Sequence, residues 1–435
     1  MTAATQVKRR SSNWAVPFFT IWIGQALSLI GSGLGGFALV WWLTDTTGSA
    51  TVLATASLVQ VLPGVILGPI AGALVDRWNR RTVMMVADSI IALLSAWLAY
   101  LFCAGAVQIW HVYAIMFARS LGGTFHWAAM QASTSLMVPK EQLARTSGMN
   151  QTLHGILNII APPLGAFLMA VMALHNILAI DVLTAAFAIV PLFFIHIPQP
   201  EREEVQDSTS TKPSILADVK EGFLYIWRWQ GLFMVLLIAV FINLLVNPGF
   251  SLMPILVTRH FGGDAVQLAW MNSAWGVGVV AGGLTLSVWG GFRRRIHTSL
   301  LGLLGMGIGV LTIGFVPPTA FGLGLFGMFL AGFMNPITNG PFFAILQDVV
   351  VPEMQGRVFT AIMSISAGAS PLGMAIAGPV ADRLGVQVWF IAGGIVALVM
   401  GLSMAFIPAV MHLEDQDGAA LERSRQKIAL EPTLE

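Results

Sequence analysis

The sequence predicts an all-α membrane protein with twelve transmembrane helices, because of its composition, its long apolar runs and the placement of its basic residues. Of the 435 residues, 56% are hydrophobic and only 10% are charged, whereas soluble domains are typically about 25% charged. A membrane-spanning helix needs about 20 mostly apolar residues, and the apolar residues extend along nearly the whole chain. This pattern excludes a soluble enzyme and a single-span receptor with a large extramembrane domain.

Apolar runs of at least 17 residues, bounded by polar residues or by Gly and Pro, define the candidate spans. The first run follows three basic residues, but it is too long for a signal peptide and lacks a small-residue cleavage pattern, so we expect it to be retained. The twelve expected spans are 17–43, 52–75, 83–103, 109–135, 149–172, 177–195, 232–257, 265–289, 299–315, 321–345, 358–380 and 388–410.

The basic residues predict the orientation of these spans. With the N-terminus inside, 19 of the 22 Lys and Arg residues lie on inner segments, two (Arg259 and Arg383) lie on outer loops, and Arg119 lies within a span. Lys and Arg favour cytoplasmic loops. We therefore expect a multi-pass protein of the cell (inner) membrane with both termini in the cytoplasm.

The longest polar segment divides the spans six and six. The expected domains are 1–196 and 232–411, joined by a cytoplasmic linker at 197–231 and followed by a cytoplasmic tail at 412–435. From Ser214 the linker has apolar residues at helical spacing, which predicts an amphipathic helix on the inner membrane surface. The alternative is a simple cytoplasmic extension of the seventh span.

The two halves repeat each other weakly. An Arg-Arg pair and a Val-Pro pair each recur at an offset of 213 residues, at 80–81 and 293–294 and at 138–139 and 351–352. Since each half has an even number of spans, these are parallel repeats related by an axis along the membrane normal. Two six-helix bundles around a central cavity are the expected architecture.

The loop after the second span reads GALVDRWNRR, from Gly72 to Arg81. A glycine permits close helix packing, arginines suit anionic headgroups, and a carboxylate is stable near a cation or a helix N-terminus. This string resembles the loop signature of the major facilitator superfamily, and the resemblance covers all twelve spans. It implies a conformational latch in which Asp76 reaches the start of helix 11, near 356–358. The latch residues would be Gly72, Asp76, Arg77, Arg80 and Arg81.

Other strings resemble one branch of that superfamily, the macrolide-efflux and siderophore-export branch. They lie at 27–50, 137–151 and 180–187. In the fifth span, APPLG (161–165) resembles part of an antiporter motif through Pro162, Pro163 and Gly165, which favours export over uptake.

Arg119 lies about ten residues into the fourth span, which places a guanidinium about 15 Å deep. A charge at that depth indicates a transport role, and ARSLGG (118–123) resembles a helix-4 signature linked to proton coupling; a structural ion pair is the alternative. The carboxylates within spans are Asp88 and Asp181. We expect Arg119 and Asp88 to form one charge-coupled unit, with Asp181 either a headgroup-level anchor or a second proton carrier.

Several kinds of site are not expected. His126 and His154 are interpreted as packing residues, and no cluster of Cys, His, Asp and Glu has metal-ligand spacing. Neither a metal nor a cofactor is expected. A net charge of +1 does not indicate nucleic acid, and no lysine follows a glycine as in a phosphate-binding loop.

Large or amide-bearing side chains in the spans suit a cavity for a bulky amphipathic molecule. The resemblance implies that spans 1, 4, 7 and 10 line this cavity. The expected lining residues are Trp22, Gln25, Phe125, Asn243, Asn247, Asn335 and Asn339.

These observations predict a secondary-active exporter of drug- or macrolide-type amphipathic compounds, working as a monomer by proton-coupled antiport and alternating access. Its partners would be a small-molecule substrate, protons and the lipid bilayer. Two alternatives stay open: export of an endogenous siderophore or lipid-like metabolite, and a non-transporting receptor or assembly factor with a transporter fold. A membrane-embedded enzyme would need more ionisable residues than the spans contain.

Overall fold

The computed structural model describes residues 14–75, 77–195, 197–199 and 215–415, and within these ranges the chain forms helices and no β-strands. Asp76 lies outside the described residues, as do residues 200–214 of the predicted linker and residues 416–435 of the predicted tail. The predicted all-α membrane fold is confirmed.

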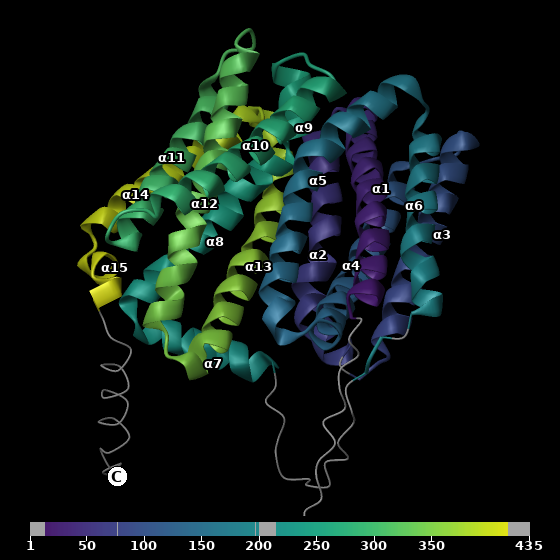
Figure 1. The fold of residues 1–435 in the computed structure, drawn as a ribbon. Coiled ribbons are helices and arrows are strands. Elements are labelled where there is room, and N and C mark those ends of the chain that lie inside the picture. The colour runs from purple at the N-terminus through teal and green to yellow at the C-terminus, as the bar shows by residue number, and fades with distance from the viewer. Residues whose placement is uncertain (1–13, 76, 196, 200–214, 416–435) are drawn as a thin grey trace, which may run out of the picture. The chain divides into compact units, whose positions relative to one another are not determined.

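Six long helices form the first part of the chain (Figure 1). Each overlaps its expected span, but several continue beyond it because polar residues stay helical past the apolar stretch; the fifth helix begins six residues early, before Arg145. A short 3-10 turn, Lys140–Gln142, precedes that helix. The six helices are α1 (Ala15–Thr47), α2 (Ala50–Val75), α3 (Arg80–Cys103), α4 (Ile109–Met137), α5 (Leu143–Val171) and α6 (Leu174–Phe194).

The second part contains six more long helices and several short ones. The long ones are α8 (Gln230–Ser251), α10 (Ala265–Trp289), α11 (Arg295–Phe315), α12 (Phe321–Val349), α13 (Pro352–Leu384) and α14 (Gln387–Phe406). The shorter elements are α7 (Ile215–Arg228), α9 (Met253–Ile255), a π-helical turn Leu256–His260, α15 (Pro408–Met411) and a 3-10 turn Leu413–Asp415.

The twelve long helices correspond to the twelve expected spans. Among the described residues, eleven of them are long and apolar enough to cross a membrane. The twelfth is α4, whose 29 residues include Arg119 and His126. These polar residues lower its mean hydropathy.

The helix predicted from Ser214 onward exists as α7 and is separate from α8, because Trp229 between them has extended backbone geometry. Ile226 and Trp229 are buried. The Glu221 carboxylate accepts a hydrogen bond of 3.0 Å from Arg357 of α13. A side chain at Gly222 would clash with the Arg357 carbonyl. Helix α7 therefore packs directly on α13.

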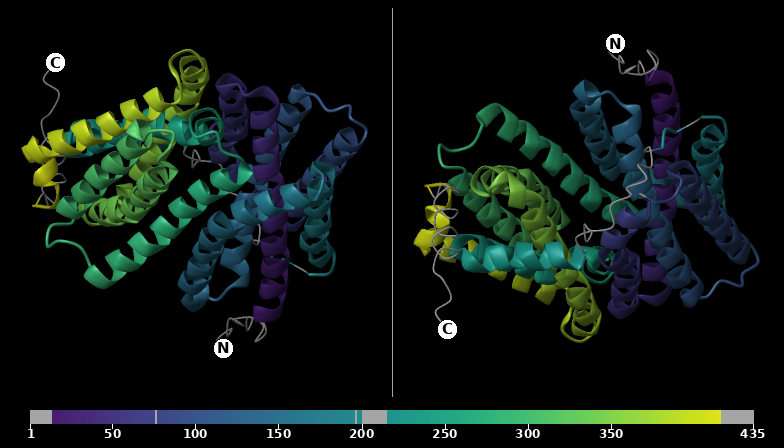
Figure 2. Two further views of the ribbon diagram at one scale, coloured as in Figure 1. Left: turned by 90° about the horizontal axis from the view of Figure 1, so that it is seen from above. Right: turned by 90° about the horizontal axis from the view of Figure 1, so that it is seen from below.

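The chain divides into two compact units. The first comprises Met1–Leu39, Val59–Leu157 and Leu164–Thr209, and the second comprises Val40–Leu58, Asn158–Pro163 and Ser210–Glu435. In the first unit α3 packs against α4 and α6. In the second, α11 packs between α12 and α14, and α8 packs on α13 and α14; the end-on views of Figure 2 show these green and yellow helices side by side.

Glycines allow α10 and α12 to approach closely. Gly278 and Gly282 form a Gly-x-x-x-Gly pair on α10, and a Cβ added at Gly282 would lie 1.9 Å from the Phe333 carbonyl oxygen. On α12, a Cβ at Gly332 would lie 2.4 Å from the Trp275 carbonyl oxygen. Small residues at such positions let membrane helices pack backbone to backbone.

Many large apolar side chains point outward, as expected for helices that face lipid. Val288 is 90% exposed, Phe406 83% and Leu93 70%. Contiguous exposed apolar surface is unusual for a soluble monomer.

Candidate functional site

Three helices of the first unit carry polar residues at the same spacing of seven, which is two helical turns. The pairs are Gln25 and Ser32 on α1, Asp88 and Ser95 on α3, and Arg119 and His126 on α4. Because seven residues rise about 10 Å along a helix, these side chains form two polar layers. We call them the Arg119 layer (Ser32, Ser95, Arg119, Asp181) and the His126 layer (Gln25, Asp88, His126).

In the Arg119 layer the guanidinium forms a buried ion pair with Asp181 of α6. Arg119 Nη1 lies 2.6 Å from Asp181 Oδ2, and the two side chains are 15% and 3% exposed. Ser32 and Ser95 each donate a hydrogen bond of 2.9 Å to the carboxylate, and Arg119 also donates one of 2.8 Å to Ser95 Oγ. The carboxylate is thus held by three side chains from three other helices.

In the His126 layer Asp88 accepts a hydrogen bond of 3.0 Å from the Gln25 amide. His126 Nε2 lies 3.5 Å from the other Asp88 oxygen, within ion-pair distance. The Asp88 side chain is 9% exposed. This layer therefore joins two titratable groups in the interior of the first unit.

The expected pairing of Arg119 with Asp88 was wrong. The depths of two residues on neighbouring helices can be compared only when both are counted from the same side, here the end of α3 and the start of α4. Counted in this way, Arg119 lies ten residues from Ile109, whereas Asp88 lies fifteen residues from Cys103. Ser95 and Asp181 lie eight and seven residues from the corresponding ends of α3 and α6, since α6 begins at Leu174 rather than at 177. Asp181 is consequently buried, and the interpretation as a headgroup-level anchor is also wrong.

Two arginines of the predicted latch bind backbone carbonyls of other helices in the first unit. Arg80 donates a hydrogen bond of 2.8 Å to the Ala132 carbonyl of α4, and Arg81 donates to the Leu192 and Phe193 carbonyls at the end of α6. Arg81 therefore lies at the C-terminal end of α6, where the last carbonyls lack intrahelical partners and a cation is stabilising. Arg77 lines an apolar groove between α3 and α4, and a Cβ at Gly72 would meet no atom within 4 Å.

The antiporter-like segment lies within a continuous α5, with Pro162 and Pro163 inside the helix. A Cβ at Gly165 would lie 2.9 Å from the Phe37 ring of α1, so this glycine sets the packing of α5 on α1. His154 contacts the Trp127 ring at 6.0 Å between centroids, as expected of a packing histidine, whereas His126 faces a carboxylate.

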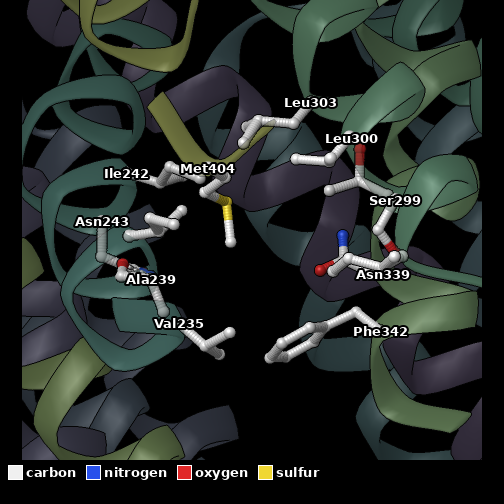
Figure 3. A pocket seen from close by; sticks show the side chains of 13 residues that line it. Val235, Ala239, Ile242, Asn243, Ser299, Leu300, Leu303, Asn339, Phe342 and Met404 are labelled. Carbon is white, nitrogen blue, oxygen red and sulfur yellow. Dashed lines mark hydrogen bonds between the residues drawn. The ribbon is translucent and has the colours of Figure 1, made fainter. Parts of the chain in front are cut away.

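The second unit contains two adjoining cavities, of about 360 Å³ and about 140 Å³, which share Ile242, Thr338 and Asn339. Figure 3 shows the smaller one, with Asn243 of α8 and Asn339 of α12 on opposite walls and with Phe342 and Met404 beside it. The larger one is lined by α8, α10, α11 and α12, and its polar residues are Asn247, Asn272, Asn335, Thr338 and Asn339. All four predicted asparagines of this half therefore line a cavity.

The predicted lining residues of the first half contact other residues of the first unit. Trp22 donates a hydrogen bond of 2.7 Å to Asn150, Gln25 binds Asp88, and Phe125 stacks on Trp78 at 6.1 Å between ring centroids.

Sequence reasoning missed several residues of these sites. Ser32 and Ser95 were not predicted, although each lies seven residues after a polar residue of its helix, a spacing that would have placed them on one face. Asn272 was not predicted, because it lies on the eighth expected span, outside the four spans that the resemblance implied. Ser299 of α11, which also lines the smaller cavity, gives no signal in the sequence.

Residues 14–433 match the model of the transmembrane secretion effector family. The chain belongs to this family of the major facilitator superfamily. It is 34% identical over 403 residues to macrolide efflux protein A of Streptococcus pyogenes, covering 93% of this chain and 98% of that protein. It is 25% identical over 408 residues to the multidrug efflux pump Tap of Mycolicibacterium fortuitum, covering 92% and 97% of the two chains.

Among solved structures, the nucleoside transporter NupG resembles this chain with a TM-score of 0.67 at 14% identity, over 89% of this chain and 98% of the other. That likeness confirms the transporter fold. The relatives identify this member of the secretion effector family as a multi-pass membrane exporter of the drug-efflux type, and the expectation that it is not an enzyme is confirmed.

Proposed function

We propose that this exporter moves bulky amphipathic compounds out of the cell by alternating access, in exchange for protons. The observation that carries the proposal is the Arg119 layer, where a nearly inaccessible ion pair between Arg119 and Asp181, together with the two serines, connects α1, α3, α4 and α6. Charges within a membrane protein are costly, so their presence indicates function. The macrolide and multidrug efflux activity of the relatives supports the substrate class.

A proton that binds the Asp181 carboxylate removes its negative charge and weakens its attraction to Arg119. The guanidinium then changes partners, and the hydrogen bonds from Ser32 and Ser95 reorganise at the same time. Such a change shifts the population between two conformations only if they differ in affinity for the proton. Loss of the proton to the other side restores the ion pair and resets the cycle.

The His126 layer supplies a second pair of titratable groups two helical turns away. In this proposal a proton passes between Asp88 and His126. Their nearest side-chain atoms lie 3.5 Å apart, so a small rearrangement first brings them within hydrogen-bond distance. We assign this layer to proton delivery and the Arg119 layer to coupling. The two layers are separated by about 10 Å along the helices, so proton transfer between them requires a chain of water molecules.

A reconstitution experiment tests the proposed function. Purified protein in liposomes with an imposed pH gradient should accumulate a fluorescent macrolide on the acidic side, and a protonophore should abolish the accumulation. Accumulation that is equal with and without the gradient would overturn proton coupling, while a lack of any protein-dependent movement would overturn macrolide transport.

The orientation is also a proposal: both termini lie in the cytoplasm and the protein works in the cell membrane as a monomer. Ser210→Cys and Ser424→Cys, each combined with Cys103→Ser, should resist an impermeant maleimide added to intact cells, because the basic residues favour the inner side. Both should react after the cells are opened. Efficient labelling of either cysteine in intact cells would contradict the proposed orientation.

The latch remains a proposal as well. Arg80 and Arg81 tie the start of α3 to α4 and to the end of α6, and the proposed latch assigns its charged group to Asp76. In the Gly72–Arg81 segment, Arg77 borders an apolar groove whose lining includes Trp78 and Val83.

A further inference from the structure

The amide-lined cavities of the second unit contain no ionisable side chain among the described residues that line them. The lining residues of both are aliphatic, aromatic, thioether, hydroxyl or amide groups. A charged group that leaves water needs an opposite charge or several hydrogen bonds. A cationic or anionic portion of a ligand would find no counter-ion among these residues.

Several polar groups of these cavities have no hydrogen-bond partner within the part of the chain that the structure describes. The side-chain amides of Asn272 and Asn335 face the larger cavity without a protein partner. The Ser299 hydroxyl of the smaller cavity is buried, since the residue is 7% exposed, and its oxygen has no partner. Buried polar groups are ordinarily hydrogen-bonded, which makes the unpaired Ser299 hydroxyl in the cavity wall unusual. The Asn272 and Asn335 amides are only partly buried and can bond a ligand in the larger cavity directly.

The other amides are positioned by the protein. Asn243 donates to the Ala239 carbonyl at 2.8 Å and accepts from Asn247 at 2.8 Å, while Asn339 donates to the Asn335 carbonyl at 3.0 Å. Each amide keeps further donor or acceptor positions. Beside them, Phe250 and Trp275 form an apolar wall with ring centroids 5.0 Å apart.

We infer that these cavities bind the uncharged, multiply oxygenated part of the substrate, such as a hydroxylated lactone ring, with Asn272, Asn335 and Ser299 as specificity-determining residues. Hydroxyl, ester and ether groups match amides that both donate and accept, and the hydrocarbon of the ring matches the aromatic wall. This inference rests on the proposed function and names the substrate chemistry that it requires.

Equilibrium dialysis of the full chain in nanodiscs tests the inference with two probes, a neutral polyhydroxylated macrolactone and the same macrolactone carrying one tertiary amine on the ring. The neutral probe should bind at least about tenfold more tightly. Asn272→Leu, Asn335→Leu and Ser299→Ala should each weaken its binding about threefold to tenfold, the usual range for one hydrogen bond. Thr285→Val is the control on α10, because its hydroxyl is exposed and bonds only the Ala281 carbonyl.

Asn335→Asp should reverse the preference, since it supplies a carboxylate for the amine. Equal or tighter binding of the amine-bearing probe to the unmodified protein would overturn the inference, and so would unchanged binding of the neutral probe in all three cavity variants. Ser299→Ala removes a hydroxyl with no protein partner, so its result does not depend on a loss of folding. Dialysis needs no proton gradient. If the protein prefers the neutral probe in dialysis but shows no gradient-driven transport, the result counts against the proposed function and not against this inference.

Discussion

Replacement of Asp181 by Asn is expected to abolish gradient-driven transport and to lower the stability of the first unit. The change leaves the Arg119 guanidinium buried with Ser95 as its remaining neighbour in the layer. Removing one partner of a buried ion pair typically costs about 3–5 kcal/mol. Arg119→Gln should be less destabilising, because a buried carboxylate can take up a proton while an arginine stays charged.

The double variant Arg119→Gln with Asp181→Asn separates structure from coupling. It removes both charges, so thermal stability in detergent should return close to that of the unmodified protein. Transport should then be passive, with substrate equilibrating but not accumulating. Arg295→Gln is the matched control, because its partner Asp348 is 64% exposed and exposed pairs contribute about 0–1 kcal/mol. Recovery of uphill transport in the double variant would show that the pair is only structural.

Replacement of Gly282 by Ala is expected to have the second largest effect. The added Cβ would lie 1.9 Å from the Phe333 carbonyl oxygen, so α10 and α12 must separate. Overpacking of this kind costs about 1–3 kcal/mol. Because Asn272 and Asn335 lie on these two helices and line one cavity, the variant should lose substrate binding together with thermal stability.

Gly283→Ala provides the control for this prediction on the neighbouring residue. A Cβ there would meet no atom within 4 Å, and alanine favours a helix over glycine by about 1 kcal/mol. The Gly283 variant should therefore be as stable as the unmodified protein or more so. Equal melting temperatures for the two glycine variants would contradict the proposed close contact.

The fold was predictable because a chain that crosses the membrane must satisfy its backbone hydrogen bonds internally, as a helix does, and because such a helix needs a long apolar run. The position of α4 was found despite Arg119 and His126, because its apolar residues still extend over 27 residues from 109 to 135. The helix ends were less predictable, since polar residues such as those around Arg145 remain helical outside the apolar stretch.

The site was predictable by residue type but not by partnership. Arg119, Asp88 and Asp181 stood out because ionisable residues are rare within apolar runs. Which carboxylate pairs with Arg119 depends on where α6 begins and on the end of α3 from which the depth of Asp88 is counted. An error of three residues in a helix boundary shifts the inferred depth of a side chain by about 5 Å. The serines that complete the Arg119 layer are ordinary residues in the sequence, and only their spacing of seven marks them.

Proton movement driven by substrate is the most direct test of the proposed exchange. Liposomes that contain the protein and an internal pH dye, with no imposed gradient, would be given a macrolide on one side only. We expect protons to move opposite to the macrolide as it flows down its gradient, and we expect the Arg119→Gln/Asp181→Asn variant to pass macrolide without moving protons. Macrolide flux through the unmodified protein with no accompanying pH change would contradict proton-coupled export.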